Sequence, residues 1–575
     1  MKRSGRKTGF PRRPPAGSAV STWKLWACVS LAALAVGLWL YWPALHGPFL
    51  FDDFGLPFKL TARVEPLSSW VSGVRPVLMF SYWLNNRIWG DGAFSYHVVN
   101  VLIHAANAGL IFLILLRLMG MAGWADRRAR IAAVIGAAVF LVHPLETESV
   151  SYVAGRSESL AALFLLLAYA CFLYRRHESI AWKEALAVML LFGLAIATKE
   201  NAISLAGILV LTDLFWPAPF TLQGLRGNWR LYALMVPGAI AAAVAVFRML
   251  AAAPSAGFSL RTFTWYQYAF TEARAIFAYI WLAVLPMGQS VDHDFPISRT
   301  VAEHGALFFM LLLAALVALA VRAHRRFPLA CFGLLMFLIW LAPTSSVVPI
   351  NDALVERRMY LALLGLILIA ADLAGRLRLP RHASSSAIAA LLLVLTAFCY
   401  SRNQQWGQPE RLFAAAALES TGNPRPYATL TDILIAEGRC AVAIPYLERA
   451  DRLFPDDYLI QLNWGRALEC MGRPGDAMRR LRRAATIRPT SKAYELIGLL
   501  YGELRMTGDA GIALRQAVAL DPASAPAHRA LALWYESVYN FTAAETEYRR
   551  SLAVDRNDRD TLVSLARVRQ LRAAQ

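Results

Sequence analysis

The stretch WKLWACVSLAALAVGLWLYWPAL, residues 23–45, decides the fold of this chain. Lys24 is its only charged residue, and as a helix it is long enough to cross a hydrocarbon core, which needs roughly 20 apolar residues. Tryptophans stand near both ends, where aromatic side chains favour the membrane interface. No small-residue cleavage site follows it, so the run is predicted to be a retained membrane anchor and not a signal peptide.

Ten further apolar runs follow the first, which predicts about eleven spans within residues 23–401. The composition agrees, because 57% hydrophobic residues, 17% charged residues and a mean hydropathy of +0.43 exclude an ordinary soluble enzyme. The further spans are predicted at 98–119, 130–145, 159–175, 184–198, 202–217, 231–250, 302–321, 328–344, 359–376 and 385–400.

One apolar run, residues 268–285, does not fit this count. If it were a full span, Asp292 and Asp294 would lie on the inner side, and every later basic loop would lie outside the cytoplasm. It is therefore predicted to be an interfacial or re-entrant helix on the outer side, where Glu272 and Arg274 would form a wet face.

The orientation follows from residues 1–22, a basic tail that the positive-inside rule keeps in the cytoplasm. Later arginine clusters then also fall inside, whereas thirteen of the 19 acidic residues before residue 402 fall in outer loops or at their edges. The Arg-rich, Lys-poor composition favours a multi-pass protein of a bacterial inner membrane. The inner clusters are Arg127, Arg128 and Arg130; Arg175 and Arg176; Arg322, Arg325 and Arg326; and Arg376, Arg378 and Arg381.

The net charge of +19 does not form a nucleic-acid-binding patch. Residues 402–575 carry 24 basic and 20 acidic residues, so the excess belongs to the membrane part. Nucleic acid is therefore excluded as a partner.

Residues 402–575 change to amphipathic helices with a period of 33 to 34 residues. Pro455, Pro489 and Pro522 recur after similar Ala-rich helices, in ERADRLFP, RRAATIRP and RQAVALDP. This pattern resembles the tetratricopeptide repeat, in which each helix-turn-helix unit buries its apolar face against its neighbours. Eleven spans from a cytoplasmic N-terminus would leave these repeats outside the cytoplasm, as an arm that recognises proteins.

Cys440 and Cys470 lie in the repeats, at helix ends that antiparallel packing would bring together. A disulfide between them is one prediction, and two small core side chains are the alternative. The spacing of the six cysteines fits no metal site.

Polar motifs gather in the predicted outer loops. The acidic pair Asp52–Asp53 follows the first span, with apolar neighbours on both sides that make a plain solvated turn less fitting. The other candidates lie at the edges of later spans, and they are Arg75; Asn100 and His104 in YHVVNVLIHAAN; His143, Glu146, Glu148 and Arg156 in HPLETESVSYVAGRSE; Lys199 and Glu200 in TKEN; and Glu356, Arg357 and Arg358 in VVPINDALVERRMYL.

Together these motifs resemble the GT-C class of integral-membrane glycosyltransferases, and most closely the tetratricopeptide-repeat protein O-mannosyltransferase-like family. The resemblance implies an all-α fold, with a polytopic GT-C-like transferase domain at 23–401 and an extracytoplasmic repeat solenoid at 402–575. It also implies a polyprenyl-phosphate sugar donor, a protein Ser/Thr hydroxyl as acceptor and an inverted product. The sugar, mannose or another, stays open.

The residues suit this chemistry. A hydroxyl is a weak nucleophile, so Asp52 or Asp53 is predicted to accept its proton as a general base. A leaving lipid phosphate needs cations, for which Arg156, Lys199, Arg357 and Arg358 are candidates, with anchoring to membrane-lipid headgroups as the alternative.

Other roles stay open at this point. His104 would orient the pocket or be a core histidine, and Glu146 and Glu148 would bind sugar hydroxyls or hold Arg156. A divalent cation on the acidic pair is not excluded, although no further ligand is fixed by spacing.

Other classes of protein remain as alternatives. One is a transferase that acts on a glycan or lipid acceptor, and another is a non-catalytic membrane scaffold that presents the repeats. A transporter would carry ionisable groups near the bilayer midplane, whereas the acids here lie at the outer edges.

Overall fold

The computed structural model describes residues 16–56, 66–175, 179–216, 219–252, 257, 262–377, 380–556 and 558–574. The described residues form helices and no β-strand, which confirms the all-α class. The chain divides into two compact units, each considered by itself: unit 1 is residues 1–56 and 65–408, and unit 2 is 57–64 and 409–575. The basic tail up to residue 15, together with Arg176 and Arg378, lies outside the described residues.

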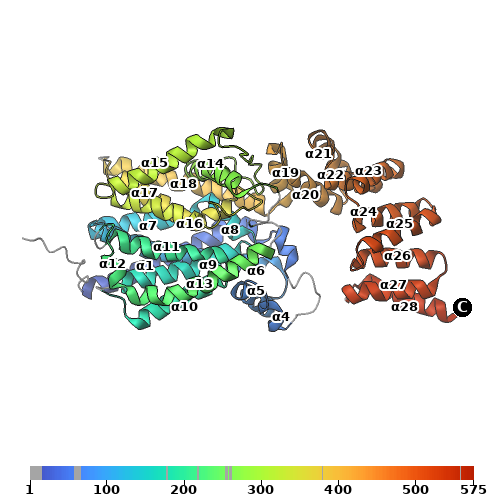
Figure 1. Cartoon of the computed structure of the whole chain (residues 1–575), viewed down its shortest axis with the longest axis horizontal. Helices are drawn as coiled ribbons and strands as arrows, with labels where there is room; N and C mark the ends of the chain where they lie inside the picture. The colour runs from blue at the N-terminus through green and yellow to red at the C-terminus, as the bar shows by residue number, and fades with distance from the viewer. Residues whose placement is uncertain are drawn as a thin grey trace, which may run out of the picture. The chain divides into compact units, whose positions relative to one another are not determined.

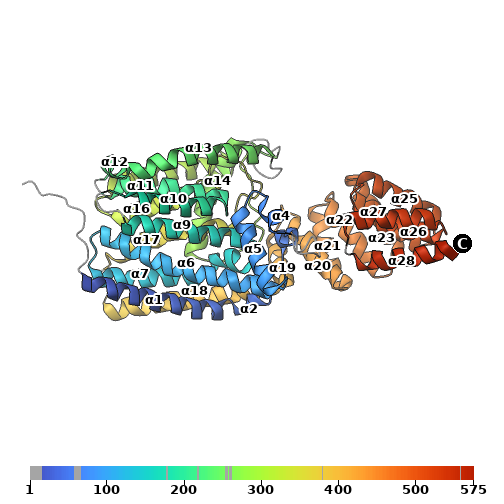
Figure 2. The same ribbon diagram turned by 90° about the horizontal axis from the view of Figure 1, so that it is seen from below.

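Every apolar run predicted as a span forms a helix in unit 1, because a backbone in an apolar medium must satisfy its hydrogen bonds internally. Figures 1 and 2 show these helices running side by side along one direction. They are α1 (Ala16–Leu40), α6 (Ala93–Met121), α7 (Asp126–Val142), α9 (Arg156–Arg175), α10 (Trp182–Ile196), α11 (Ser204–Phe215), α13 (Trp229–Ala252), α15 (Ala306–Ala323), α16 (Pro328–Leu341), α17 (Met359–Ala374) and α18 (Arg381–Trp406).

Shorter helices connect them. They are α2 (Trp42–Leu45), η1 (Phe51–Gly55), α4 (Leu67–Val71), α5 (Pro76–Trp89), η2 (Pro144–Glu146), α8 (Thr147–Ser151), η3 (Glu200–Ile203), α12 (Gln223–Gly227), η4 (Glu303–Gly305) and η5 (Glu356–Arg358).

Among the described residues, five helices are long and apolar enough to cross a membrane, or six if the bent pair of α7 and α8 forms one span. This chain is therefore a membrane protein, as the composition predicted. The number of eleven spans stays a prediction, since several of the other helices are short or carry polar ends.

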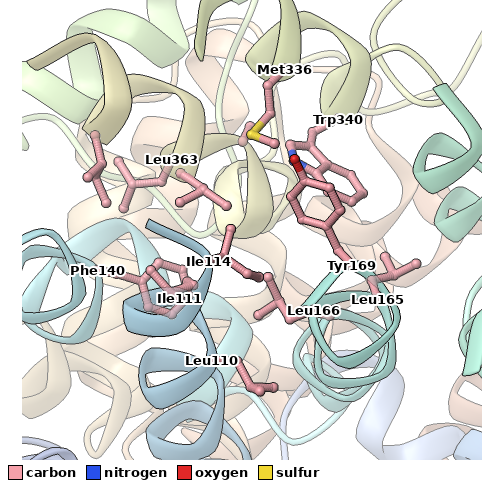
Figure 3. Close-up of a cluster of buried hydrophobic side chains, with 14 of the residues drawn as sticks. Leu110, Ile111, Ile114, Phe140, Leu165, Leu166, Tyr169, Met336, Trp340 and Leu363 are labelled. Carbon is pink, nitrogen blue, oxygen red and sulfur yellow. The ribbon is translucent and has the colours of Figure 1, made fainter. Parts of the chain in front are cut away.

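The core of unit 1 is one continuous cluster of apolar side chains. Figure 3 shows its centre, where residues of α6 such as Ile111 and Ile114 meet Phe140 of α7, Leu166 of α9 and Met336 of α16. Such close packing gives the helix ends a fixed relative position. The loops at those ends are thereby held in place.

Helices α16 and α17 pack closely against each other. A Cβ atom on Gly333 would overlap the carbonyl oxygen of Gly365, and a Cβ on Gly365 would overlap that of Gly333. Small residues let helices approach closely where no hydrophobic effect drives their association. This contact fixes the start of α17, which η5 precedes directly.

We call one end of unit 1 the site end, where α7 and α10 end and α9 and α17 begin. The arginines of the predicted inner loops that the structure describes lie at the opposite end. Examples are Arg127 at the start of α7 and Arg175 at the end of α9.

Helix α14 (Trp265–Val284) contains the run that did not fit the count of spans. Near its start, the hydroxyl of Tyr268 donates to the carbonyl of Thr344 at 2.6 Å. Near its end, the carbonyl of Ala283 accepts from His143 at 2.9 Å. Both ends therefore contact residues of the site end, which favours a helix that lies along the interface.

Unit 2 is a row of antiparallel helix pairs with a further helix at each end, which is the arrangement of tetratricopeptide repeats (Figure 1). The pairs are α20 (Arg425–Ala436) with α21 (Cys440–Leu453), α22 (Tyr458–Cys470) with α23 (Pro474–Ile487), α24 (Ser491–Glu503) with α25 (Thr507–Leu520), and α26 (Ala525–Ser537) with α27 (Phe541–Val554); α19 (Pro409–Glu419) and α28 (Arg559–Ala574) flank them.

The recurring prolines mark the starts of repeats. Each stands one or two residues before a capping side chain that accepts a hydrogen bond from the first turn of the next helix. The caps are Asp457 of α22, Thr490 of α24 and Ser524 of α26. The sequence period therefore coincides with the repeat boundary.

A disulfide joins Cys440, at the start of α21, to Cys470, at the end of α22, at a sequence separation of 30. The predicted pairing is confirmed. It links two successive repeats, and such bonds persist in oxidising compartments.

We expect the double substitution Cys440→Ser/Cys470→Ser to destabilise unit 2 by about 3 kcal/mol, since a bond closing a loop of this length restricts the unfolded chain. Thermal unfolding of the full-length protein in detergent, with limited proteolysis to follow the repeats, would measure this. The single substitution Cys171→Ser, at a free cysteine of unit 1, is the control. An unchanged protease resistance of the repeats in the double variant would contradict the prediction.

Candidate functional site

The two carboxylates of the acidic pair in η1 have different surroundings. The side chain of Asp53 is buried, and its carboxylate accepts hydrogen bonds from the backbone N–H groups of Leu50 (2.9 Å) and Ala154 (2.7 Å). Asp52 is exposed, and its backbone N–H donates to the hydroxyl of Tyr152 at 2.9 Å. Asp53 therefore holds the loop in place, and Asp52 remains accessible from the solvent.

The segment that donates a backbone N–H to the carboxylate of Asp53 is a tight turn before α9. A Cβ atom on Gly155 would lie 2.6 Å from the carbonyl oxygen of Glu148 and 2.8 Å from that of Tyr152. Only glycine permits this approach of backbone to backbone. Gly155 thereby keeps the N–H of Ala154 directed at the carboxylate of Asp53.

Arg156, the first residue of α9, is fully buried and is held by uncharged acceptors. Its Nε donates to the side-chain oxygen of Asn100 at 2.7 Å, and its Nη2 donates to the side-chain oxygen of Asn85 and the carbonyl of Tyr96, both at 3.0 Å. The guanidinium also lies 4.6 Å from the ring centroid of Tyr82. Arg156 therefore ties α5, α6 and α9 together.

Asn100 completes this network. Its amide nitrogen donates to the carbonyls of Val150 at 3.1 Å and Tyr152 at 3.2 Å, while its oxygen accepts from Arg156. The buried amide thus positions the turn that binds the acidic pair.

The two candidate histidines are bonded within the protein. His104 donates from Nε2 to the carbonyl of Leu141 at 3.2 Å and accepts at Nδ1 from the hydroxyl of Tyr360 at 2.9 Å. His143 donates from Nε2 to Ala283, and its Nδ1 accepts from the N–H of Leu145. Both rings therefore contribute to the packing of the site end.

Three candidate cations stay partly exposed at the site end. The side chains of Arg75, Lys199 and Arg357 are 36%, 11% and 31% exposed. Each is paired with a glutamate: Arg75 with Glu200, Lys199 with Glu158, and Arg357 with Glu148.

The pair of Arg75 and Glu200 is bidentate, with N–O distances of 3.0 and 2.6 Å. Burial alone would raise the pKa of Glu200, but the hydrogen bonds and charge of Arg75 outweigh it and lower that pKa. Both partners are therefore charged at neutral pH.

These ion pairs and the acidic pair form one electrostatic cluster. Lys199 interacts with the charges of Arg75 and Arg357 as well as with its own partner. Arg357 interacts with Tyr152, and the charges of Asp52 and Asp53 act on the same tyrosine. Two of the four candidate phosphate ligands, Lys199 and Arg357, thus belong to the same electrostatic cluster as the acidic pair and Arg75, whereas Arg156 lies in the uncharged network described above.

Glu356 binds the loop that follows α14. Its carboxylate is buried and accepts from the amide of Gln289 at 2.6 Å and the N–H of Ser290 at 2.8 Å, and it pairs with His293 at 2.9 Å. These three partners hold the loop at the site end.

The last two candidates, Arg358 and Glu146, have little exposed side-chain surface. Arg358 donates to the carbonyls of Asp352 at 2.6 Å and Ala353 at 3.0 Å and lies 3.6 Å from Glu272. Glu146 is fully buried and interacts with Tyr41 and Tyr360. Neither Glu146 nor Glu148 holds Arg156 among the described residues, since Arg156 is bonded to Asn100, Asn85 and Tyr96 and Glu148 is bonded to Arg357.

Burial raises the pKa of the Asp53 carboxyl to about 7, with a contribution from the neighbouring charge of Asp52, although the hydrogen bonds from Leu50 and Ala154 oppose the shift. Between about pH 4 and 7 the folded protein therefore holds a proton that the unfolded chain has released. This group stabilises the fold most at low pH, and its contribution is lost as the pH rises through 7.

We therefore expect wild-type protein to lose thermal stability between about pH 4 and 7 relative to Asp53→Asn, whose neutral amide does not titrate. The measurement is the unfolding temperature of both proteins in detergent across this range, with Asp91→Asn, at an exposed loop position, as the control. A difference in unfolding temperature that does not change with pH would show that Asp53 does not titrate there.

Several residues of the site were not among the candidates. The hydroxyl of Tyr152 accepts a hydrogen bond from the backbone N–H of Asp52, and its ring stacks on Trp406, with ring centroids 6.1 Å apart. Glu158 holds Lys199 and accepts from Asn201 at 3.2 Å. Tyr152, Glu158 and Asn201 all lie inside the motifs quoted in the sequence analysis. Treating every polar residue of those motifs as a candidate would therefore have identified them.

The acidic pair does not supply a ligand set for a divalent cation. Both oxygens of Asp53 already accept backbone N–H groups, which leaves one exposed carboxylate, on Asp52. Within the described ranges no three His, Cys, Asp or Glu side chains are grouped as metal ligands would be. A hard cation such as Mg²⁺ or Ca²⁺ would need further oxygen ligands.

Comparison with known proteins supports the family resemblance. Protein O-mannosyl-transferase TMTC3 of Homo sapiens is 23% identical over 594 residues, covering 92% of this chain and 64% of that protein. Protein O-mannosyl-transferase TMTC2 of Mus musculus is 28% identical over 207 residues, covering 32% of this chain and 24% of that protein. The predicted resemblance is confirmed, and the chain spans less than two-thirds of the length of these relatives. No protein-family model matches it.

Among solved structures, a tetratricopeptide repeat protein of Thermus thermophilus is 21% identical, with a TM-score of 0.26, and covers 31% of this chain and 94% of its own. Yeast Tom70 is 14% identical, with a TM-score of 0.28, and covers 80% of this chain and 96% of its own.

Proposed function

We propose that this chain transfers a sugar from a polyprenyl-phosphate donor to a Ser or Thr hydroxyl of a protein, with inversion at the anomeric carbon. The observation that carries the proposal is the exposed carboxylate of Asp52 in the same electrostatic cluster as the partly exposed cations Arg75, Lys199 and Arg357, at one end of a membrane bundle. The names of the relatives support transfer of mannose.

Asp52 acts as the general base. The acceptor hydroxyl gives its proton to the Asp52 carboxylate as its oxygen attacks the anomeric carbon. Asp53 is a positioning residue, because its carboxylate is already engaged by two backbone N–H groups and is shielded from solvent.

The cations bind the donor phosphate. As the bond between the anomeric carbon and the phosphate oxygen breaks, negative charge grows on the phosphate, and fixed cations stabilise it. Each cation already faces a glutamate, so a phosphate enters a site whose cations are held in position. Attack from the face opposite the phosphate inverts the configuration.

The same arrangement supports the proposed orientation. The site end lies opposite the arginine-bearing loops that the positive-inside rule keeps in the cytoplasm. A disulfide in unit 2 suits an oxidising, extracytoplasmic compartment, where the repeats recruit the acceptor.

The test is transfer of radiolabelled mannose to protein by the purified full-length chain in nanodiscs, with a mixture of periplasmic proteins as acceptors. We expect label from polyprenyl-phosphate mannose and none from a nucleotide sugar. If label appeared only in lipid or glycan, the acceptor would be a lipid or glycan and not a protein. Absence of label from any polyprenyl-phosphate hexose, with the protein folded, would overturn the proposal.

A further inference from the structure

Unit 2 contains a groove that the chemistry proposed above does not use. It has a volume of about 910 Å³ and lies between α21, α22 and α23. Five arginines and three acidic residues line it, which leaves a surplus of positive charge. The arginines are Arg473, Arg479, Arg480, Arg482 and Arg483.

The arginines come from the pattern of one helix. In α23, Ala477, Leu481 and Ala484 are buried against neighbouring helices. The four arginines at positions 479, 480, 482 and 483 therefore fall on the opposite side of the helix, since residues three and four apart share a face. An ordinary solvated face would carry both signs, whereas this one is almost wholly basic.

The floor of the groove is apolar. Half-buried Trp464 lies beneath Arg480, and the half-buried side chains of Ile487 and, from the preceding repeat, Ile444 add to the apolar lining. The guanidinium carbon of Arg480 lies 3.4 Å from the ring centroid of Trp464, which fixes that arginine over the floor.

The outer arginines are free to exchange partners. Arg483 pairs with Asp456 at 3.0 Å, but the two side chains are 49% and 81% exposed, and ion pairs this exposed contribute little. Arg479 and Arg473 share the single carboxylate of Asp476. A ligand carboxylate can therefore replace or add to these contacts without leaving a buried charge unpaired.

We propose that this groove binds an acidic peptide segment of the acceptor protein. Its carboxylates pair with Arg479 and Arg483, and an apolar side chain between them packs on Trp464. The inference rests on the proposed function, in which the repeats recruit the acceptor. It names the groove as the binding site and an acidic peptide as the ligand.

The shape of the site favours a peptide over an anionic membrane surface. A flat layer of headgroups would reach the exposed tips of Arg479 and Arg483 but not the half-buried ring of Trp464. An extended peptide presents charged and apolar side chains alternately, and so matches both the basic rim and the apolar floor.

The experiment measures binding of two fluorescent peptides to the full-length chain in nanodiscs of neutral phosphatidylcholine. One peptide is rich in Asp and Glu around a central Leu, and the other carries Asn and Gln in their place. We expect the acidic peptide to bind at least about 10-fold more tightly, and the double variant Arg479→Gln/Arg483→Gln to lose that preference.

The matched control is Arg549→Gln/Arg572→Gln, which removes two exposed, ion-paired arginines from another part of the same repeats. An equal loss in this control, equal binding of both peptides, or displacement of the peptide by vesicles of anionic phospholipid would overturn the inference. The unfolding temperatures of both double variants are measured as well, to check that the repeats remain folded.

Binding is measured without transfer, so the two proposals fail separately. Asp52→Asn should bind the acidic peptide as wild-type protein does. Transfer without this binding would overturn the inference alone, and binding without transfer would overturn the proposed function alone.

Discussion

Asp52→Asn is expected to lower the rate of sugar transfer by about 10²- to 10⁴-fold, the range that a positioned general base contributes. The amide has the size of the carboxylate but cannot accept the proton of the acceptor hydroxyl. Because the exposed side chain of Asp52 holds no part of the fold, the unfolding temperature should stay within about 1–2 °C of wild type. Transfer from labelled donor under single-turnover conditions is the measurement.

Asp53→Asn distinguishes the two carboxylates. It should retain more transfer activity than Asp52→Asn and lose more thermal stability, since it replaces an oxygen that accepts a backbone N–H. The opposite ranking would assign the base to Asp53 and give Asp52 the lesser role.

Arg156→Met is expected to destabilise unit 1 by roughly 3–5 kcal/mol, the cost of breaking a buried charged network. Methionine fills a similar length but leaves the oxygens of Asn85, Asn100 and Tyr96 buried without their donor. Because the same network holds the turn that receives Asp53, transfer should fall together with stability. Thermal unfolding in detergent, followed by light scattering, measures the effect.

Two variants separate charge from packing. Arg156→Lys keeps the charge but cannot match the planar fork of donors, so we expect an intermediate loss. Arg87→Met, at an exposed position of α5, should change stability by less than about 0.5 kcal/mol. A fully stable Arg156→Met would show that the network is not a structural element of unit 1.

Periodic features of this chain could be predicted from sequence. Apolar runs of sufficient length became helices because an apolar medium leaves the backbone no alternative. The repeat boundaries at Pro455, Pro489 and Pro522 were visible because these prolines recur with a period of 33 to 34 residues, each one or two residues before a helix cap. The same helix-pair geometry predicted the disulfide only as one of two alternatives, and the structure decides in its favour.

The pairing of charged side chains could not be predicted in this way. Arg357 and Glu148 lie 209 residues apart, and nothing in the local sequence of either indicates the other. The quoted motifs identified Arg156 as polar and near the outer edge, but its burial depends on how α5, α6 and α9 pack. The difference between Asp52 and Asp53 likewise depends on a turn 100 residues away.

The disulfide between Cys440 and Cys470 also bears on how the molecule is made. A bond of this kind forms only after both thiols have left the reducing cytosol. Under the proposed orientation, newly synthesised chains would acquire it only once their repeats had been translocated, so a shift in gel mobility after reduction would separate translocated molecules from arrested ones. In that orientation the bond would record the translocation of the repeats, and this record could be read on the unmodified protein.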